Sequence, residues 1–263
     1  MARTSHTDSG NTLKSLFKAV DVLDCFSQVD RALTLAEIAE RAGIPKTTAH
    51  RILATFREAG FVEQDHGRDS YRLGLRLFEL GNLVLANMDL HREATPFIEQ
   101  LMERSGEGVH LFVFTGTRVV AVDHRDANGR IVNTVTTITG APAYCTGVGK
   151  AALAFQEPAV VARVIRDVLR PFTQNTITDA DVLRRELAVV RERGYAIDNG
   201  EHEPGLHCVA APIRNAAGVV FGAISVSGPA IRLTEDRDEA LGELVVDVAA
   251  RLSRQLGCRG DIA

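Results

Sequence analysis

The sequence predicts an α+β protein with two domains: a small one of three helices and a hairpin, and a larger one with an antiparallel sheet flanked by helices. Three observations predict this division. Residues 13–74 show helical apolar spacing broken by short turns, and they end in a hairpin signal. Residues 75–90 are an apolar helical linker. From 91 to 263, strand-like runs alternate with helical ones.

The composition is that of a globular protein able to bury a core. Of 263 residues, 45% are hydrophobic and 24% are charged. No apolar run approaches the ~18–20 residues of a membrane span. Residues 1–12 are polar, so we expect a disordered tail, no signal peptide and a cytoplasmic location. The four cysteines form no C-x-x-C pair and are expected to be reduced.

The overall charge does not indicate a nucleic-acid-binding protein. The formal net charge is −4, while residues 1–80 carry 11 basic and 11 acidic side chains. The rest of the chain therefore holds the negative excess. Any DNA binding must depend on where charges are placed locally.

The first domain begins with a helix that places Leu16, Ala19, Val20, Leu23 and Phe26 at helical spacing. This apolar stripe predicts a helix that packs against the rest of the domain.

A second and a third helix follow. Thr34 with Glu37 is a capping box for the second, which Gly43 ends. Pro45 fits the first turn of the third helix, which runs to about Ala59. The turn between them is about three residues long, as in a helix-turn-helix. Two strand-like runs then flank residues 66–69, which completes a winged helix-turn-helix pattern.

The third helix crowds hydrogen-bond donors at its start, in the stretch AGIPKTTAHRIL. A recognition helix presents its N-terminal residues to the major groove, and its N–H groups favour phosphates. We expect Lys46 and Arg51 to contact phosphates or guanine, and Thr47, Thr48 and His50 to contact base edges or backbone oxygens. The alternative is an ordinary amphipathic helix with a solvated polar face.

Two further residues join this set. Thr34 precedes the second helix, and Arg68 at the hairpin tip either reaches a phosphate or a narrow minor groove or is merely solvated. The candidate DNA-binding residues are therefore Thr34, Lys46, Thr47, Thr48, His50, Arg51 and Arg68.

The second domain contains several strand and helix signals. We expect a hairpin in 109–125, strands in 131–138, 194–200, 206–215 and 219–228, and helices in 151–170, 181–194 (capped by Thr178 with Asp181) and 234–257.

With these segments in order, the chain resembles the IclR family of bacterial transcriptional regulators. The resemblance is carried by LTLAEIAERAGIPKTTAHRIL, GFVEQD with YRLG, GAPAYCTGVGKAALA, ELAVVRERGYAID and HCVAAPIRNAAGVVFGAISVSGP. It implies a winged helix-turn-helix and a C-terminal domain similar to GAF folds that binds a small molecule. It also implies a dimer or tetramer on a palindromic operator, a repressor more often than an activator, and no cofactor.

The resemblance also implies an effector site. In the family, effectors contact the glycine turn before a helix, an acid after the Gly-Tyr strand, a cysteine ten residues later and serines on the last strand. In this sequence those positions are Gly147, Val148, Asp198, Cys208, Ser225 and Ser227. A buried Asp198 would suit a ligand that offers a hydroxyl, amine or amide hydrogen, whereas the plain alternative is a turn residue.

Two positions depart from the family pattern. Tyr144 stands where the family more often has histidine, and Gly200 where an acid is common. Both lie beside the expected pocket, so the departures allow an effector unlike small keto acids. Tyr144 either stacks on an aromatic ligand or packs in the core.

The stretch TGVGKAAL invites two nucleotide-binding interpretations, and neither holds. A P-loop needs glycine and Ser or Thr where this chain has Tyr144 and Ala151. A dinucleotide fingerprint needs a strand and an acid that do not follow here. What remains is a glycine turn that either offers N–H groups to a small ligand or is a plain loop.

The sequence offers weaker signals for three other functions. Cys145, His202, His207 and Cys208 match no standard zinc spacing. An enzyme would use Cys208 or Cys145 as nucleophile with a nearby histidine as base, but no local signature supports it. The charge balance of residues 1–80 leaves a protein-interaction role for the first domain open.

Overall fold

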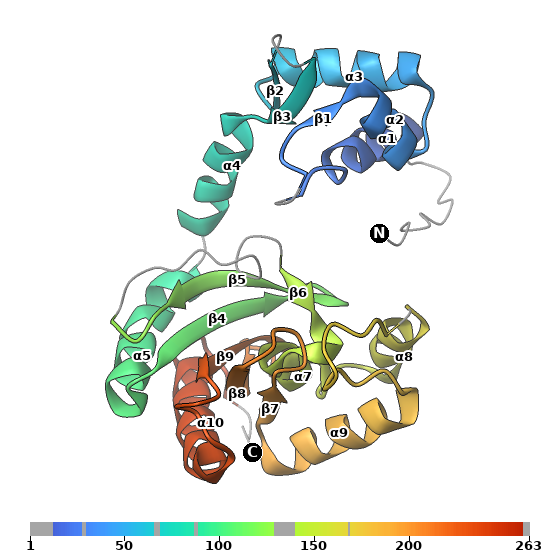
Figure 1. The fold of residues 1–263 in the computed structure, drawn as a ribbon. Coiled ribbons are helices and arrows are strands. Elements are labelled where there is room, and N and C mark those ends of the chain that lie inside the picture. The colour runs from blue at the N-terminus through green and yellow to red at the C-terminus, as the bar shows by residue number, and fades with distance from the viewer. Residues whose placement is uncertain are drawn as a thin grey trace. The chain divides into compact units, whose positions relative to one another are not determined.

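A computed structural model describes residues 13–27, 30–65, 69–86, 89–128, 140–167 and 169–259, with side chains described outside 82–89. The chain divides into two compact units, Met1–Met88 and Asp89–Ala263 (Figure 1). None of the helices within these ranges combines the length and apolar character that a membrane crossing requires.

The first unit is a helix-turn-helix with a small sheet. Its elements are α1 (Lys14–Leu23), β1 (Leu33–Thr34), α2 (Leu35–Ala42), α3 (Lys46–Glu58), β2 (Val62–Asp65), β3 (Ser70–Leu73) and α4 (Leu75–Ala86). The antiparallel strands lie in the order β1-β3-β2, and the β2–β3 hairpin pairs Val62 with Leu73 and Asp65 with Ser70. The predicted winged arrangement is confirmed, with β1 as an unpredicted third strand. Residues 66–68 of the hairpin tip, including Arg68, lie outside the described residues.

Local signals set the helix-turn-helix geometry. The N–H of Glu37 donates to Thr34 Oγ1 at 3.4 Å, and the N–H of Thr34 donates to Glu37 Oε2 at 2.8 Å, which forms the predicted capping box. Gly43 ends α2 with φ 65°, a left-handed conformation that costs glycine little. Pro45 immediately precedes α3. Residues 43–45 therefore encode the tight turn between α2 and α3.

The core of the first unit uses only part of the predicted stripe of α1, together with Val22, which the stripe did not include. Val22 is buried, whereas Leu16 and Val20 are 61% and 49% exposed. Leu23 and Phe26 only flank the core. The helix is apolar on more than one face, and spacing alone cannot choose which face packs.

The second unit is one antiparallel sheet with helices on both faces. Its elements are α5 (Asp89–Ser105), β4 (Gly108–Phe114), β5 (Arg118–Arg125), β6 (Ala141–Pro142), the 3₁₀ turn η1 (Ala143–Cys145), α7 (Gly147–Leu153), α8 (Pro158–Arg166), α9 (Ala180–Arg193), β7 (Ala196–Asn199), β8 (Leu206–Arg214), β9 (Val220–Pro229), η2 (Glu235–Arg237) and α10 (Asp238–Gln255). The strand order is β6-β5-β4-β9-β8-β7.

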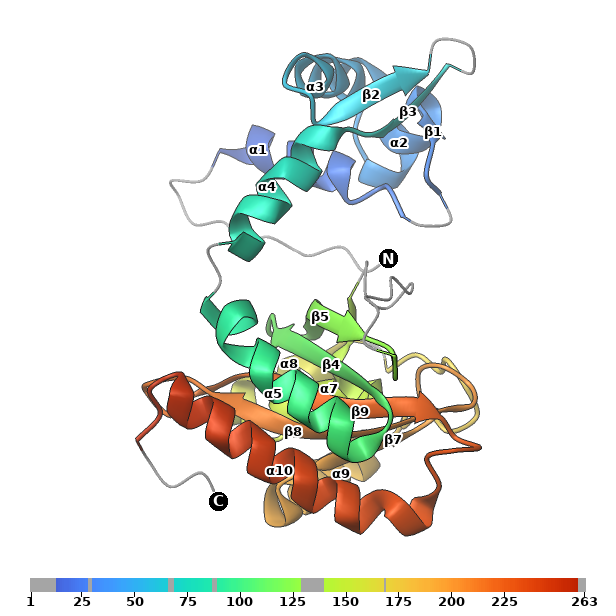
Figure 2. The ribbon, with the colours of Figure 1, turned by 90° about the vertical axis from the view of Figure 1, so that its left-hand side faces the viewer.

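The two faces of the sheet carry different helices. The helices α5 and α10 pack together on one face, while α7 lies against β8 and β9 on the other and contacts α9 (Figure 2). Residues alternate between the faces along a strand, and helices cover both faces, so most residues of β8 and β9 are buried. The expected α+β architecture is therefore confirmed.

Three local expectations need correction or cannot be placed. The cap of α9 is Asp179, whose Oδ1 accepts from the N–H groups of Asp181 and Val182, so Thr178 was off by one residue. The helix expected over 151–170 is two helices, because Pro158 begins α8 after α7 has ended. The strand expected over 131–138 lies outside the described residues.

The buried face of α9 generates a stability prediction. Leu187 is buried in the core between α9 and the sheet, while Val189 on the same helix is exposed. Leu187→Ala should lower the free energy of unfolding by about 2–5 kcal/mol, because it leaves a cavity. Val189→Ala, the control, should change it by less than about 0.5 kcal/mol. Urea unfolding followed by circular dichroism measures both, and equal losses would contradict this packing.

Candidate functional site

The start of α3 presents the predicted donors to solvent. Ala49 and Leu53 anchor the helix in the core of the first unit. Around them, Lys46, Thr47, His50 and Arg51 are exposed and Thr48 is half-buried. This placement leaves the donors available to a duplex, as a recognition helix requires.

Thr34, a candidate DNA contact, also has a structural role. Its hydroxyl is exposed and donates to Glu37 Oε2 at 2.8 Å within the capping box. It therefore fixes where α2 begins, and only its remaining hydrogen-bonding capacity faces outward.

The second unit holds a cavity of about 230 Å³ on the α7 face of the sheet. Strands β4, β5, β8 and β9 form its floor, and the first turn of α7 with the segment before β8 forms its walls. Six of the seven predicted effector residues line it: Gly147, Val148, Asp198, Cys208, Ser225 and Ser227.

Glycine lets α7 approach the sheet closely. A Cβ on Gly147 would lie 2.9 Å from Cys208 Sγ, and one on Gly149 would lie 2.3 Å from the carbonyl oxygen of Ala143. The hydroxyl of Thr146 caps the helix by accepting from the N–H of Gly149 at 3.1 Å. The glycine turn of the sequence is thus a close-packed helix start that borders the cavity.

Asp198 is a buried carboxyl group at the cavity wall. Its Oδ1 accepts from the N–H of Glu201 at 2.7 Å. Burial raises the pKa of Asp198, while hydrogen bonds from the N–H groups of Glu201 and Gly147 oppose this shift. The residue is neither a solvated turn residue nor an ordinary exposed acid.

The serines of β9 carry unused hydrogen-bonding capacity. The hydroxyl oxygens of Ser225 and Ser227 are buried and have no conventional partner among the described residues. Their polar neighbour is the thiol of Cys208, a weak hydrogen-bonding group. Buried hydroxyls normally have hydrogen-bond partners, so a ligand in the cavity would supply the partners that these two hydroxyls lack.

Tyr144, the seventh predicted residue, is not among the described residues that line the cavity. Its ring belongs to the core beneath α7 and α9, and its hydroxyl donates to the carbonyl oxygen of Arg170 at 2.8 Å. Burial raises its pKa to about 12. Two roles were expected for Tyr144, stacking on a ligand or packing in the core, and these contacts correspond to packing.

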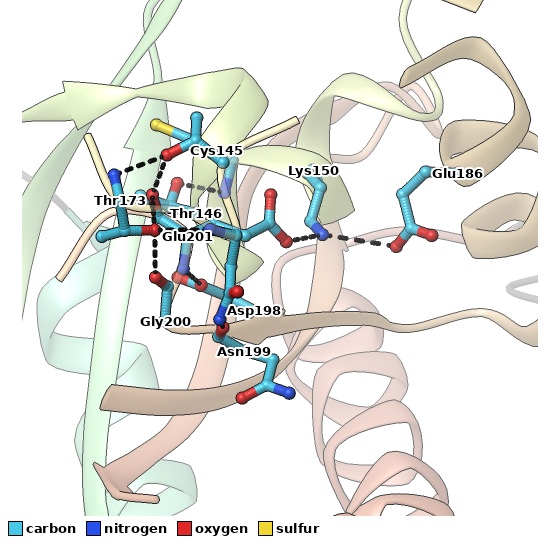
Figure 3. A network of polar contacts seen from close by, with 12 residues as sticks. Cys145, Thr146, Lys150, Thr173, Glu186, Asp198, Asn199, Gly200 and Glu201 are labelled. Carbon is cyan, nitrogen blue, oxygen red and sulfur yellow. Dashed lines mark hydrogen bonds and ion pairs between the residues drawn. The ribbon is translucent and has the colours of Figure 1, made fainter. Parts of the chain in front are cut away.

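A buried charge network next to the cavity escaped the sequence analysis (Figure 3). The side chain of Lys150 is only 2% exposed, and its Nζ contacts Glu201 Oε1 and, at 3.3 Å, Glu186 Oε1. Burial raises the pKa of Glu201 to about 7, and the Lys150 charge opposes that shift. The hydroxyl of Thr176 donates to the carbonyl oxygen of Glu201 at 2.6 Å.

A signal for this network was present in the sequence. Lys150 stands in the stretch TGVGKAAL, and Glu201 directly follows Gly200, where the family commonly has an acid. A lysine inside an apolar helix calls for a buried acid, but spacing does not say which one.

Three histidines also line the cavity, and sequence reasoning did not place them together there. They are His110 on β4, His124 on β5 and His202 before β8. The rings of His110 and His124 have centroids 3.7 Å apart. The β4–β5 hairpin pairs His110 with His124, and the segment before β8 brings His202 to the same wall.

The residues considered for a metal or a nucleophile are placed otherwise. Adjacent residues of a strand point to opposite faces, so His207 and Cys208 diverge, and His207 Nε2 lies 2.6 Å from Asp238 Oδ1. In the described part of the chain, no three His, Cys, Asp or Glu side chains are arranged to hold a metal. Burial raises the pKa of Cys208 to about 12 and also raises that of Cys145, which disfavours a thiolate nucleophile.

Comparison with protein families assigns both units. The family described as "IclR helix-turn-helix domain" matches residues 15–66, and "Bacterial transcriptional regulator IclR C-terminal" matches residues 82–254.

Curated and solved relatives agree over nearly the full length. HTH-type transcriptional regulator BhcR of Paracoccus denitrificans (strain Pd 1222) is 35% identical over 255 residues, 97% of this chain and 91% of BhcR. HTH-type transcriptional repressor AllR of Salmonella typhimurium (strain LT2) is 34% identical over 251 residues, 95% of this chain and 92% of AllR. The crystal structure of an IclR homolog complexed with 4-hydroxybenzoate, from Microbacterium hydrocarbonoxydans, matches with TM-score 0.72 and 28% identity over 92% of this chain and 98% of that one. With both units matched and relatives that are regulators rather than enzymes, the chain belongs to the IclR family of bacterial transcriptional regulators.

Proposed function

We propose that this IclR-type regulator is a cytoplasmic repressor of a catabolic operon, and that a small organic effector in the cavity changes its affinity for a palindromic operator. The observation that carries the proposal is a cavity lined by six effector-site positions, two of which are buried hydroxyls without a conventional partner among the described residues. The relative AllR, named a repressor, supports the sign of regulation.

DNA contact is assigned to the start of α3. The exposed cations Lys46 and Arg51 suit phosphates or guanine, and Thr47, Thr48 and His50 lie beside them on the first turns of the helix. Thr34 and Arg68 stay in the proposed contact set at the start of α2 and on the hairpin. Because the unit as a whole is not basic, affinity would depend on these few positions.

A palindromic operator requires two copies of the chain. In the first unit, Leu16 and Val20 on α1 and Leu75 and Phe78 on α4 are exposed, and Phe78 keeps 66% of its surface accessible. Exposed apolar side chains of this size favour burial against a partner. We propose that a second copy covers them in a dimer, from which a tetramer can be built.

The effector is proposed to bind with a polar group near Asp198, Cys208 and the two serines. A buried carboxyl group beside hydroxyls suits a hydroxyl, amine or amide of the ligand. The Microbacterium relative was solved with 4-hydroxybenzoate, a compound with a hydroxyl and an aromatic ring. That relative supports an organic effector of similar size.

Replacing Lys46 and Arg51 by alanine tests the DNA-binding face. The double variant should lose about 1–3 kcal/mol of operator affinity and reduce the salt slope by about one per lost phosphate contact. Gel shifts on the chain's own upstream DNA at several salt concentrations measure both. Arg166→Ala on α8, which removes an exposed charge from the other unit, is the control. Unchanged binding by the double variant would favour a protein-interaction role instead.

Ser227→Ala tests the cavity. Loss of one hydrogen bond should raise the effector concentration needed for half-maximal operator release roughly fivefold to tenfold, with effector-free DNA binding unchanged. Ser253→Ala is a matched buried control, because its hydroxyl is bonded to Ala249 on α10. A metabolite panel scored by gel shift supplies the effector. If no metabolite changes operator affinity, effector control is rejected.

Phe78→Asp tests oligomerisation through the first unit. A charge inside an apolar interface should shift the protein toward monomer in sedimentation velocity and weaken binding to a two-half-site operator. Phe172→Asp changes an exposed phenylalanine of the second unit and should leave the assembly unchanged. An equal shift in both variants would argue against the proposed interface.

A further inference from the structure

The cavity extends across the sheet and has two chemically different ends. Its polar end, near α7, is formed by Asp198, Cys208, Ser225 and Ser227. The aromatic side chains of the lining, called here the ring end, are those of His110, Phe112, His124 and His202, and the charged residues Arg125, Asp126, Glu203 and Arg232 also line the cavity.

The strand register fixes the order of the two ends. His110 on β4 is paired with Ser225 on β9 and, on its other side, with His124 on β5. A molecule held at the serines therefore reaches His110 first and His124 beyond it. An effector that fills the cavity must therefore have atoms at both of its ends.

The aromatic rings of the ring end pack against neighbouring rings. The centroids of His110 and His124 are 3.7 Å apart, with planes inclined by 46°, and Phe112 lies 6.3 Å from His110. His202 packs against Phe172 with centroids 4.7 Å apart. Aromatic rings prefer tilted or offset neighbours, so one more ring would find matching faces and edges.

The imidazoles at this end are neutral at physiological pH. Burial lowers the pKa of His110 to about 3, and the neighbouring His124 adds to that shift. Burial also lowers the pKa of His124 and His202, although Asp123, Asp126 and Glu203 oppose it. Neutral rings require no counter-ion, and a neutral imidazole carries one donor and one acceptor.

The volume agrees with a ring. An apolar cavity of about 150 Å³ holds benzene, and this cavity measures about 230 Å³. A two- or three-carbon acid at the polar end would leave the ring end unfilled. A six-membered ring with one polar substituent matches the length and both chemistries.

We propose that the ring end receives an aromatic or heteroaromatic ring of the effector, so that His110 and His124 select a ring-bearing effector over a short aliphatic one. The inference rests on the proposed role of the cavity as the effector site. It assigns the aromatic contact to His110 and His124, which line the cavity, and not to Tyr144, which packs in the core.

Calorimetric titration of the full-length protein with two matched pairs tests the inference. The pairs are benzoate with cyclohexanecarboxylate, and benzamide with cyclohexanecarboxamide, and propionate serves as the short acid. Within each pair the head group is constant and only planarity changes. We expect at least one planar member to bind roughly threefold to tenfold tighter than its saturated partner and tighter than propionate.

Variants of His110 and His124 test whether these two residues cause the preference for planar probes. His110→Leu should abolish the planar-to-saturated ratio, His110→Phe should restore it, and His124→Leu should reduce it. His91→Leu, on α5 and outside the cavity lining, is the control and should keep the ratio. A fold check by circular dichroism accompanies each variant.

The outcomes separate this inference from the proposed function. Tighter binding of propionate or the saturated members, a ratio that survives His110→Leu, or no binding of any planar probe at millimolar concentration would overturn the ring assignment. If an aliphatic metabolite nevertheless alters operator affinity, the effector-controlled regulator stands without a ring. If planar probes bind but operator affinity never changes, the ring end stands and the regulatory mechanism fails.

Discussion

The second unit depends on one buried positive charge. Lys150 lies inside an otherwise apolar helix, and an unpaired ammonium group there would cost several kcal/mol. Glu201 and Glu186 supply the compensation from two other parts of the chain. The same Glu201 donates its N–H to Asp198, so the ion pair sets the position of a cavity-wall carboxyl group. The charge, the helix and the site are therefore stabilised together.

The cavity follows from the alternation of β9. Ile224 and Val226 face the helices α5 and α10, which leaves the intervening residues to face α7. Ser225 and Ser227 occupy those positions, where a continuous apolar core would place aliphatic residues. Gly147 brings a helix start within reach of the same strands. β9 is buried on both faces, but its face toward α7 has less apolar packing than a continuous core would have. The polar end of the cavity lies there.

Local patterns sufficed for much of the fold. Thr34 with Glu37, Gly43 and Pro45 specify the helix-turn-helix through contacts a few residues apart. The effector positions came from resemblance, and six of them do meet in one cavity.

The remaining features depend on contacts between distant parts of the chain. The packed face of α1 was only partly predicted, because the helix is apolar on several sides and the other helices decide which side packs. The pairing of Lys150 with Glu201 arises from tertiary neighbours, which no spacing encodes. His110 and His124 are partners in the predicted 109–125 hairpin, but its register and the cavity beside it were not predicted.

The position of β4 has a consequence for biosynthesis. This central strand lies between β5 and β9, and β9 ends at Pro229, more than a hundred residues later. Non-local pairing is slow and waits until both strands have left the ribosome, whereas domains near the N-terminus fold first. The helix-turn-helix, with its short-range contacts, would be complete on a nascent chain that cannot yet enclose a small molecule. A ribosome that stops early would release a headpiece without its sensor.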